Sequence, residues 1–164
     1  MSRMILKSPK PDTVYLLPGE FYFGESNTRI ETLLGSCVSV TVWHPLLRIG
    51  GMSHSMLPSR NKNGKHNLDG RYGDESIELF LREIYKRNTR PEEYQVKVFG
   101  GGSMFQQFRV EGAFNVAERN IETIRVLLKD SGFDIHVEHV GDNGHRIIIF
   151  DLSDGDVWVK HEKI

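Results

Sequence analysis

The clearest pattern in this 164-residue chain lies in Thr32–Pro45, TLLGSCVSVTVWHP, and in Gly50–His54, GGMSH. In an extended strand side chains alternate between two faces, so Val38, Val40 and Val42 should point one way and the residues between them the other. The proline that ends the first segment predicts a reversal, because proline fixes its own backbone and restricts the residue before it. We therefore expect an antiparallel hairpin.

This hairpin brings the single cysteine of the chain towards a histidine. A turn centred between Pro45 and Leu46 would place Cys37 directly opposite His54. Directly opposed residues share a face, with Cβ atoms about 5 Å apart, which suits a thiol and an imidazole that exchange a proton. An odd loop, or a bulge in the second strand, would instead move the histidine to the other face.

Both residues also have an ordinary structural interpretation. A lone cysteine is commonly a buried thiol. His54 alternates with Met52 and Met56, as a histidine packed in a core would. The proposed pairing, and the hydroxyl residues on the cysteine face of the strand, are the features that point to a nucleophile with its base, and from the residues alone both interpretations stay open.

The composition is that of a globular protein. The length of 164 residues predicts one domain over 1–164, and the polar stretch 1–12, which contains two prolines, predicts a loose N-terminal arm. A net charge of −1 gives no electrostatic footprint for nucleic acid. No stretch approaches the roughly 18 apolar residues that insert into a membrane. We expect a cytoplasmic location.

Metal and cofactor sites are not expected. One cysteine excludes an internal disulfide and any multi-cysteine metal site, and the seven histidines lack the spacing of metal ligands. Gly100–Ser103 lacks the spacing and the lysine of a phosphate-binding loop. We interpret it as a tight turn or as backbone that lines a cleft.

Two helices beside several strands predict an α+β class. The first helix should cover 74–87, with Asp74 as its N-cap and Asn88 at its end. The second should begin at Asn115 and have Gly132 as its C′ residue. Further strands are expected at 13–17, 21–23, 30–34, 94–99, 133–137, 146–150 and 157–159.

Three segments outside these elements also carry predictions. The long polar loop from Pro58 to Tyr72 is of a length that is usually functional, so we expect a lid or a substrate-contacting loop. Gly141–Gly144 predicts a turn from which the next strand returns as a hairpin. Asn120 on the second helix is interpreted as a solvated or capping side chain.

Five blocks of sequence resemble one known family when they are taken together. They are LGSCV at 34–38, GMSHSMLP at 51–58, RYGD at 71–74, FGGGSMF at 99–105 and NVAERN at 115–120. Their order and content are similar to those of the chemoreceptor glutamine deamidases of bacterial chemotaxis, the CheD family. The resemblance runs from about Tyr22 to Lys160.

This resemblance implies a fold and a reaction. The fold would be mixed β-sheets packed as a sandwich with two helices on one side, similar to bacterial toxin deamidases. The reaction would convert receptor glutamines to glutamate with release of ammonia, through a thioester on Cys37 and with His54 as its base. The third catalytic residue of the family is a threonine. Gap-free alignment places Glu31 there, and we select the adjacent Thr32.

The implied mechanism requires a thiolate and donors for an oxyanion. Proton transfer to the histidine would leave an ion pair that lowers the pKa of the cysteine. The turn at Gly35 and Ser36 should supply backbone donors, with Gly101, Gly102 and Ser103 lining the substrate site. Hydrolysis of a glutamate methyl ester is a chemically adjacent side activity.

The implied partners are the cytoplasmic helices of methyl-accepting chemotaxis receptors and a CheC-type phosphatase of the response regulator. Two other functions stay open. A non-catalytic interaction module would keep these binding surfaces without the chemistry. A cysteine peptidase would use the same pair of residues to cut a main chain, so truncation of the receptor would distinguish it from deamidation.

Overall fold

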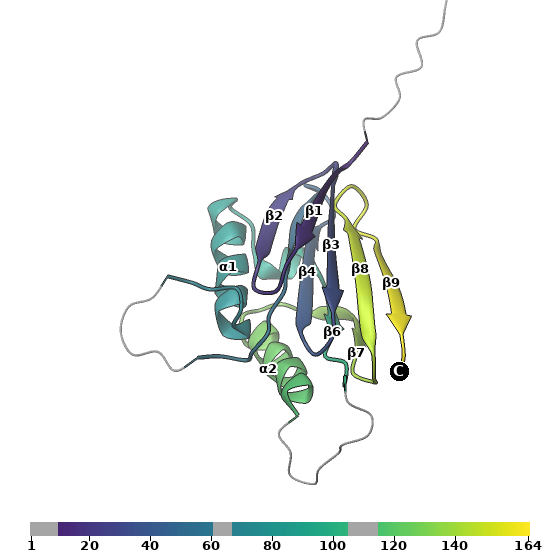
Figure 1. The fold of residues 1–164 in the computed structure, drawn as a ribbon. Coiled ribbons are helices and arrows are strands. Elements are labelled where there is room, and N and C mark those ends of the chain that lie inside the picture. The colour runs from purple at the N-terminus through teal and green to yellow at the C-terminus, as the bar shows by residue number, and fades with distance from the viewer. Residues whose placement is uncertain (1–9, 61–66, 105–114) are drawn as a thin grey trace, which may run out of the picture.

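The computed structural model describes residues 10–60, 67–104 and 115–164. In these parts of the chain, strands form two sheets beside two α-helices (Figure 1). The strands are β1 Asp12–Leu16, β2 Phe21–Glu25, β3 Thr28–Leu34, β4 Val38–His44, β5 Ile49–Ser53, β6 Gln95–Gly100, β7 Ile135–Val140, β8 His145–Asp151 and β9 Val157–Glu162. The helices are α1 Gly73–Lys86 and α2 Val116–Asp130, with a short 3-10 helix at Pro91–Glu93.

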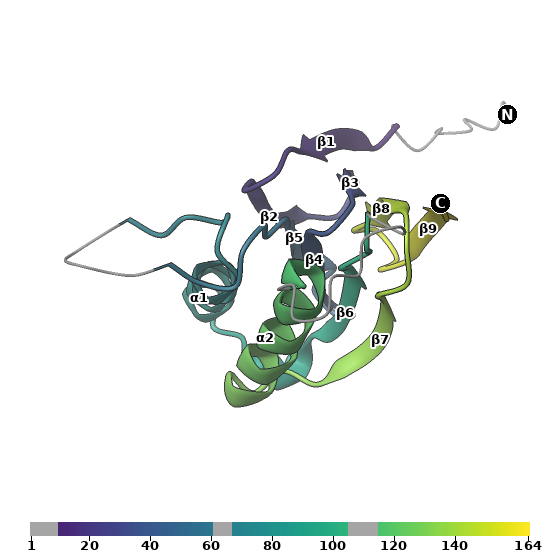
Figure 2. The same cartoon turned by 60° about the horizontal axis from the view of Figure 1, so that its bottom comes forward.

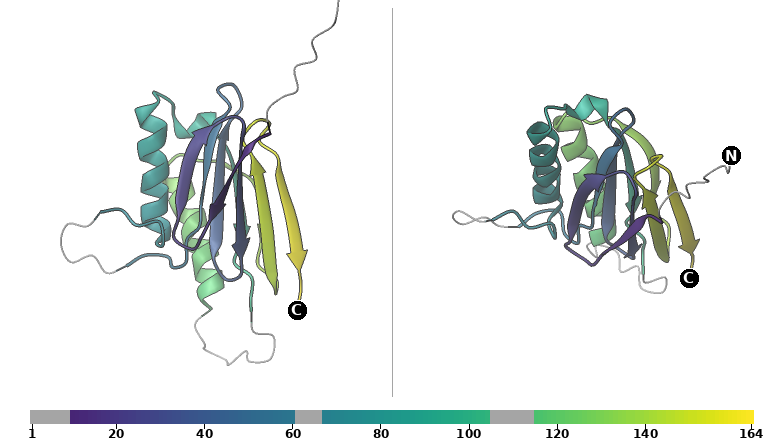
Figure 3. Two further views of the ribbon diagram at one scale, coloured as in Figure 1. Left: turned by 45° about the horizontal axis from the view of Figure 1, so that its top comes forward. Right: turned by 90° about the horizontal axis from the view of Figure 1, so that it is seen from above.

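The elements stack in three layers. A four-stranded sheet has the order β1-β3-β8-β9, and a five-stranded sheet has the order β2-β5-β4-β6-β7. Both sheets are mixed, because β1 runs parallel to β3 and β6 runs parallel to β7. The helices cover the outer face of the five-stranded sheet (Figures 2 and 3). The predicted α+β class, with two helices on one side, is confirmed.

Strand β4 lies at the centre of this arrangement and is buried along its whole length. Its valines pack against the helices, in a cluster that includes Ile77, Phe80 and Ile124. Its opposite face carries Trp43, which packs with Ile30 and other residues of the four-stranded sheet. The predicted division of faces is therefore confirmed, and both faces of the middle sheet contribute apolar burial to stability.

The register of the β4–β5 hairpin differs from the prediction by two residues. His44 pairs with Ile49, so the loop contains four residues and is not centred on the proline. It is closed by a hydrogen bond from the Arg48 N–H to the His44 carbonyl (2.8 Å), with Arg48 at a φ of 52°. Cys37 is therefore not directly opposite His54. Because the shift is even, the two residues stay on the same face of the sheet.

Both predicted helices are present. Helix α1 begins one residue earlier than expected, with Tyr72 in place of Asp74 at its N-cap, and Asn88 lies just beyond its end at a φ of 57°. The Asn115 side chain caps α2 by accepting a hydrogen bond from the Glu118 N–H (3.2 Å). Gly132 follows its C-cap residue at a φ of 90°, the left-handed conformation that glycine favours.

The segment Gly141–Gly144 does not form a hairpin turn between neighbouring strands. Strand β7 belongs to the five-stranded sheet, where it pairs with β6, whereas β8 pairs with β3 in the other sheet. The segment therefore carries the chain from one sheet to the other. It is fixed by backbone hydrogen bonds from Gly141 N to Gly100 O (3.0 Å) and from Ser103 N to Asp142 O (2.8 Å).

Two predicted segments lie partly outside the described residues. These are positions 1–9 of the N-terminal arm and 61–66 at the centre of the long polar loop. The prediction of an arm over 1–12 also extends too far, because Asp12 already belongs to β1. No helix among the described residues is both long and apolar enough to cross a membrane.

Candidate active site

Three chain segments bring Cys37, His54 and Thr32 to the space between the two sheets. The cysteine lies in the short loop between β3 and β4, and its side chain packs against the core between the sheets. The histidine directly follows β5. The threonine belongs to β3, in the four-stranded sheet. Cys37 is partly exposed, whereas His54 is only 1% exposed, so solvent reaches the site on the sulfur side.

A hydrogen bond of 2.7 Å joins the Thr32 hydroxyl to Nδ1 of His54. The same hydroxyl donates its single proton to the Leu16 carbonyl at 2.8 Å. It must therefore accept the second bond, so Nδ1 of His54 carries a hydrogen. In the neutral ring Nε2 is then the unprotonated nitrogen. The alternation of β3 explains why Thr32 makes this contact: Thr32 is buried, and the adjacent Glu31 faces the other way.

Burial disfavours the charged forms of both the His54 imidazole and the Cys37 thiol. It lowers the pKa of His54 to about 4, against a weaker opposing effect of the Glu20 carboxylate. Burial also raises the pKa of the Cys37 thiol above 9.0. Loss of solvation destabilises the charged form of each group, which is the imidazolium of His54 and the thiolate of Cys37. The pKa of the histidine therefore falls and that of the cysteine rises. Burial thus favours the neutral thiol and the neutral imidazole, and these shifts are opposite to those expected of an ion pair.

The loop that carries the cysteine is fixed by its backbone. Val38 and Ser55 exchange two backbone hydrogen bonds of 3.0 and 2.9 Å. Gly101 N donates to the Cys37 carbonyl at 2.8 Å, and Gly102 N donates to the Gly35 carbonyl at 2.9 Å. The predicted glycine turn thus lies directly against the loop.

Gly100 shows why this turn needs glycine. It has a φ of 105°, and a Cβ there would lie 2.2 Å from the Cys37 carbonyl oxygen. A residue with a side chain would displace the cysteine loop. Ser103 places its backbone against the 142–144 segment, where Gly144 N donates to its carbonyl at 2.9 Å.

Donors for a bound oxyanion remain in the cysteine loop. The N–H groups of Gly101 and Gly102 are occupied by loop carbonyls. Within the described residues, the N–H groups of Ser36 and Cys37 donate to no other residue.

Asn120 contradicts its interpretation as a solvated or capping side chain. It is 1% exposed. Its Nδ2 donates to the Met56 carbonyl at 2.9 Å and to the Ser36 carbonyl at 3.3 Å. Helix α2 therefore ties the cysteine loop to the segment that follows His54. A polar residue among apolar helix positions was the only available sequence signal, and it does not identify a distant partner.

Comparisons with known proteins place the sequence beside one family. The sequence model of a family described as CheD chemotactic sensory transduction matches residues 56–161. A protein of Dechloromonas aromatica (strain RCB), named probable chemoreceptor glutamine deamidase CheD 3, is 51% identical over 146 residues, or 89% of this chain and 85% of that protein. A probable chemoreceptor glutamine deamidase CheD of Pseudomonas syringae pv. syringae (strain B728a) is 48% identical over 150 residues, covering 91% of this chain and 84% of that protein.

Among solved structures, the Bacillus licheniformis hypothetical protein YfiH aligns with a TM-score of 0.47 at 13% sequence identity, covering 73% of this chain and 49% of that chain. The matches in sequence are far stronger: the family model covers more than half of the chain, and the two relatives include the segments that carry Cys37 and His54. They confirm the resemblance found in the five sequence blocks. The chain belongs to the CheD family.

Proposed function

We propose that this protein deamidates glutamine side chains of chemoreceptors, converting them to glutamate and releasing ammonia. The observation that carries this proposal is the Thr32–His54 hydrogen bond, which leaves an unprotonated nitrogen on the face that also carries Cys37. The names of the two relatives give the substrate class. The threonine, and not Glu31, takes the third position of the site.

The first half of the reaction forms a thioester. The Cys37 sulfur attacks the carbonyl carbon of the glutamine side chain while Nε2 of His54 takes the thiol proton. Because both groups start neutral, proton transfer accompanies attack and is not completed beforehand. The tetrahedral intermediate then collapses. Its C–N bond breaks, and the imidazolium returns the proton to the departing ammonia.

The second half consumes water. Neutral His54 removes a proton from a water molecule as the water oxygen attacks the thioester carbonyl. The C–S bond breaks, the thiol regains its proton, and the product is a glutamate carboxylic acid that ionises at pH 7. Each turnover therefore adds one negative charge to the receptor. A glutamate methyl ester would follow the same course with methanol as the leaving group.

The oxyanion in each half-reaction would be bound by the cysteine loop. The Ser36 and Cys37 N–H groups belong to the loop that carries the sulfur, and within the described residues they donate to no backbone carbonyl. Backbone hydrogen bonds from Gly101 to Cys37 and from Gly102 to Gly35 hold the loop with these donors in position. Ser103, the next residue, would line the substrate site together with the two glycines. Fixed backbone donors of this kind lower the barrier because they need no reorganisation during reaction.

The proposal places the protein in the cytoplasm, where it would meet the cytoplasmic helices of its receptors. A CheC-type phosphatase as a second partner stays a prediction.

The deciding test is incubation of the full chain with a purified chemoreceptor fragment. We expect ammonia release and, by mass spectrometry of peptides, conversion of specific glutamines to glutamate in an intact fragment. Binding of the fragment without ammonia release would favour the non-catalytic interaction module. Truncated fragments would favour the peptidase.

The role of the threonine is separable from simple packing. Thr32→Val keeps the shape of the side chain but removes the acceptor for the His54 Nδ1 hydrogen. The imidazole can then adopt the wrong tautomer, and we expect kcat to fall about 10- to 100-fold. Thr32→Ser restores a hydroxyl and should recover most of the activity. Equal activity of the valine and serine variants would exclude this role.

A further inference from the structure

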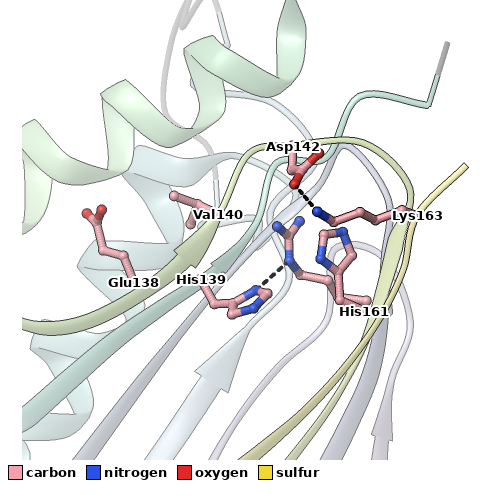
Figure 4. Close-up of a pocket in the computed structure, with 7 residues that line it drawn as sticks. Glu138, His139, Val140, Asp142, His161 and Lys163 are labelled. Carbon is pink, nitrogen blue, oxygen red and sulfur yellow. Dashed lines mark hydrogen bonds and ion pairs between the residues drawn. The ribbon is translucent and has the colours of Figure 1, made fainter. Parts of the chain in front are cut away.

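A polar pocket separate from the candidate active site lies where β7 and β9 end and β8 begins (Figure 4). Its volume is about 380 Å³, which is ample for a small ion with bound water. None of Cys37, His54 and Thr32 lines it. Its lining residues are Glu138, His139, Val140, Asp142, Arg146, His161 and Lys163.

Arg146 supplies a buried positive charge to this pocket. The residue is only 1% exposed. Its guanidinium donates to the Gly100 carbonyl (3.2 Å), the Gly141 carbonyl (2.7 Å) and Nδ1 of His139 (2.9 Å). All three acceptors are uncharged, and within the described residues Arg146 forms no ion pair with a carboxylate. Buried charges are ordinarily paired at close range, whereas the carboxylate that acts on this guanidinium, Asp142, forms its ion pair with Lys163.

The charged lining residues are Arg146 and Lys163, which are cations, and Glu138 and Asp142, which are anions, so what distinguishes them is how each is paired. Lys163 pairs with Asp142 at 2.8 Å. Arg125, which does not line the pocket, donates two hydrogen bonds to the Glu138 carboxylate (2.9 and 2.8 Å). The negative charge of Glu138 is therefore paired with a residue outside the pocket. Within the described residues, Arg146 is thus the charged lining residue that forms no ion pair, although the Asp142 carboxylate stabilises its charge from further away.

Of the two imidazoles, His139 adds a hydrogen-bond donor, whereas the N–H of His161 is already used. His161 donates through Nε2 to the Asn143 carbonyl at 2.7 Å, because a carbonyl can only accept. His139 uses the lone pair of Nδ1 to accept from Arg146, so its Nε2 carries the hydrogen. The rings lie edge to face, with centroids 5.5 Å apart. Figure 4 shows both rings, with Lys163 next to His161.

We propose that this pocket binds a small oxyanion of the phosphate class. Such an ion would supply Arg146 with a counterion at close range, and Lys163 lies beside it as a second cation. Charge-assisted hydrogen bonds from lysine and arginine to phosphate oxygens are among the strong ones in proteins. The Asp142 carboxylate opposes an anion. Neutralising Lys163 and neutralising Asp142 should therefore change the phosphate affinity in opposite directions.

Isothermal titration calorimetry of the full chain with inorganic phosphate, at constant ionic strength set by chloride, tests the site. Lys163→Gln should weaken phosphate binding about tenfold through loss of one charge-assisted contact. Lys160→Gln is the matched control: it removes the same charge from an exposed lysine of β9 that pairs with Glu162 outside the pocket. We expect it to leave the affinity within about twofold of wild type.

Asp142→Asn should have the opposite effect. It removes the negative charge that opposes an anion and frees Lys163 from its ion pair, so it should tighten binding about three- to tenfold. The variant should fold, because Asp142 has a φ of 60° and asparagine readily adopts this conformation. Arg146 is left intact, since its bond to the Gly100 carbonyl supports the cysteine loop.

Titration with phosphoserine separates two sources of the same chemistry. Binding of inorganic phosphate alone would support a site for the free ion, and binding of both would support one that is open to phosphate esters. No measurable phosphate binding at about 10 mM, or equal weakening by Lys163→Gln and Lys160→Gln, would overturn the proposal.

Discussion

Cys37→Ala should abolish ammonia release from a chemoreceptor fragment, with a loss of about 10⁴-fold or more, because no thioester can form. The thiol is the only cysteine sulfur in the chain, so no second nucleophile of this kind can replace it. The assay is the release of ammonia per mole of enzyme, followed by peptide mass spectrometry at each glutamine.

This variant should retain its fold. The side chain is only partly buried, and its removal should cost about 1 kcal/mol or less. The loop is held by backbone groups that alanine preserves, including the bond from Gly101 N to the carbonyl of residue 37. Denaturant unfolding of both proteins provides the control. A Cys37→Ala protein that folds and deamidates the fragment at a rate near that of wild type would contradict the proposed mechanism.

Features that depend on neighbouring residues could be predicted from the sequence. The Asn115 cap and the Gly132 C′ position follow from local backbone hydrogen bonding, and both are present. The two faces of β4 follow from strand geometry alone. Membership of the CheD family rests on five blocks of sequence, which identify the cysteine and the histidine more specifically than either residue does.

Features that depend on distant partners could not be predicted. The hairpin register was missed by two residues because the turn closes at Arg48, a residue with no glycine-like signal for a positive φ. The crossing at Gly141–Gly144 looks like a hairpin turn until β7 is seen to pair with β6. Asn120 and Arg146 act through carbonyl groups far along the chain, and no local pattern records such contacts.

The sequence prediction chose Thr32 over Glu31, but only the three-dimensional structure shows that Thr32 is the one that contacts His54. Adjacent residues of a strand point to opposite faces, so either could have been the inner one until the position of β3 was known. The observed order of strands places β3 inside the four-stranded sheet, with Thr32 towards His54. The same geometry determines the tautomer of the imidazole, which the sequence does not contain.

His54→Asn should reduce kcat about 10³-fold, because it removes the base while keeping an amide N–H that can donate to Thr32. The wild-type kcat/KM should persist in mildly acidic solution, since the pKa of His54 is lowered to about 4. An acid limb near the ordinary histidine value of about 6.5 would contradict the buried neutral base.

The same variant should change how stability depends on pH. The folded-state pKa of His54 is about 4, below the 6.5 of an unfolded chain, so between these values the unfolded state binds more protons. The free energy of unfolding of wild type should therefore fall as the pH drops from 6.5 towards 4, by at most about 3 kcal/mol from this residue. His54→Asn has no such proton to bind. Urea unfolding across this range should show the stability of wild type falling relative to that of the variant at low pH, and parallel curves would mean that the imidazole is not held neutral by burial.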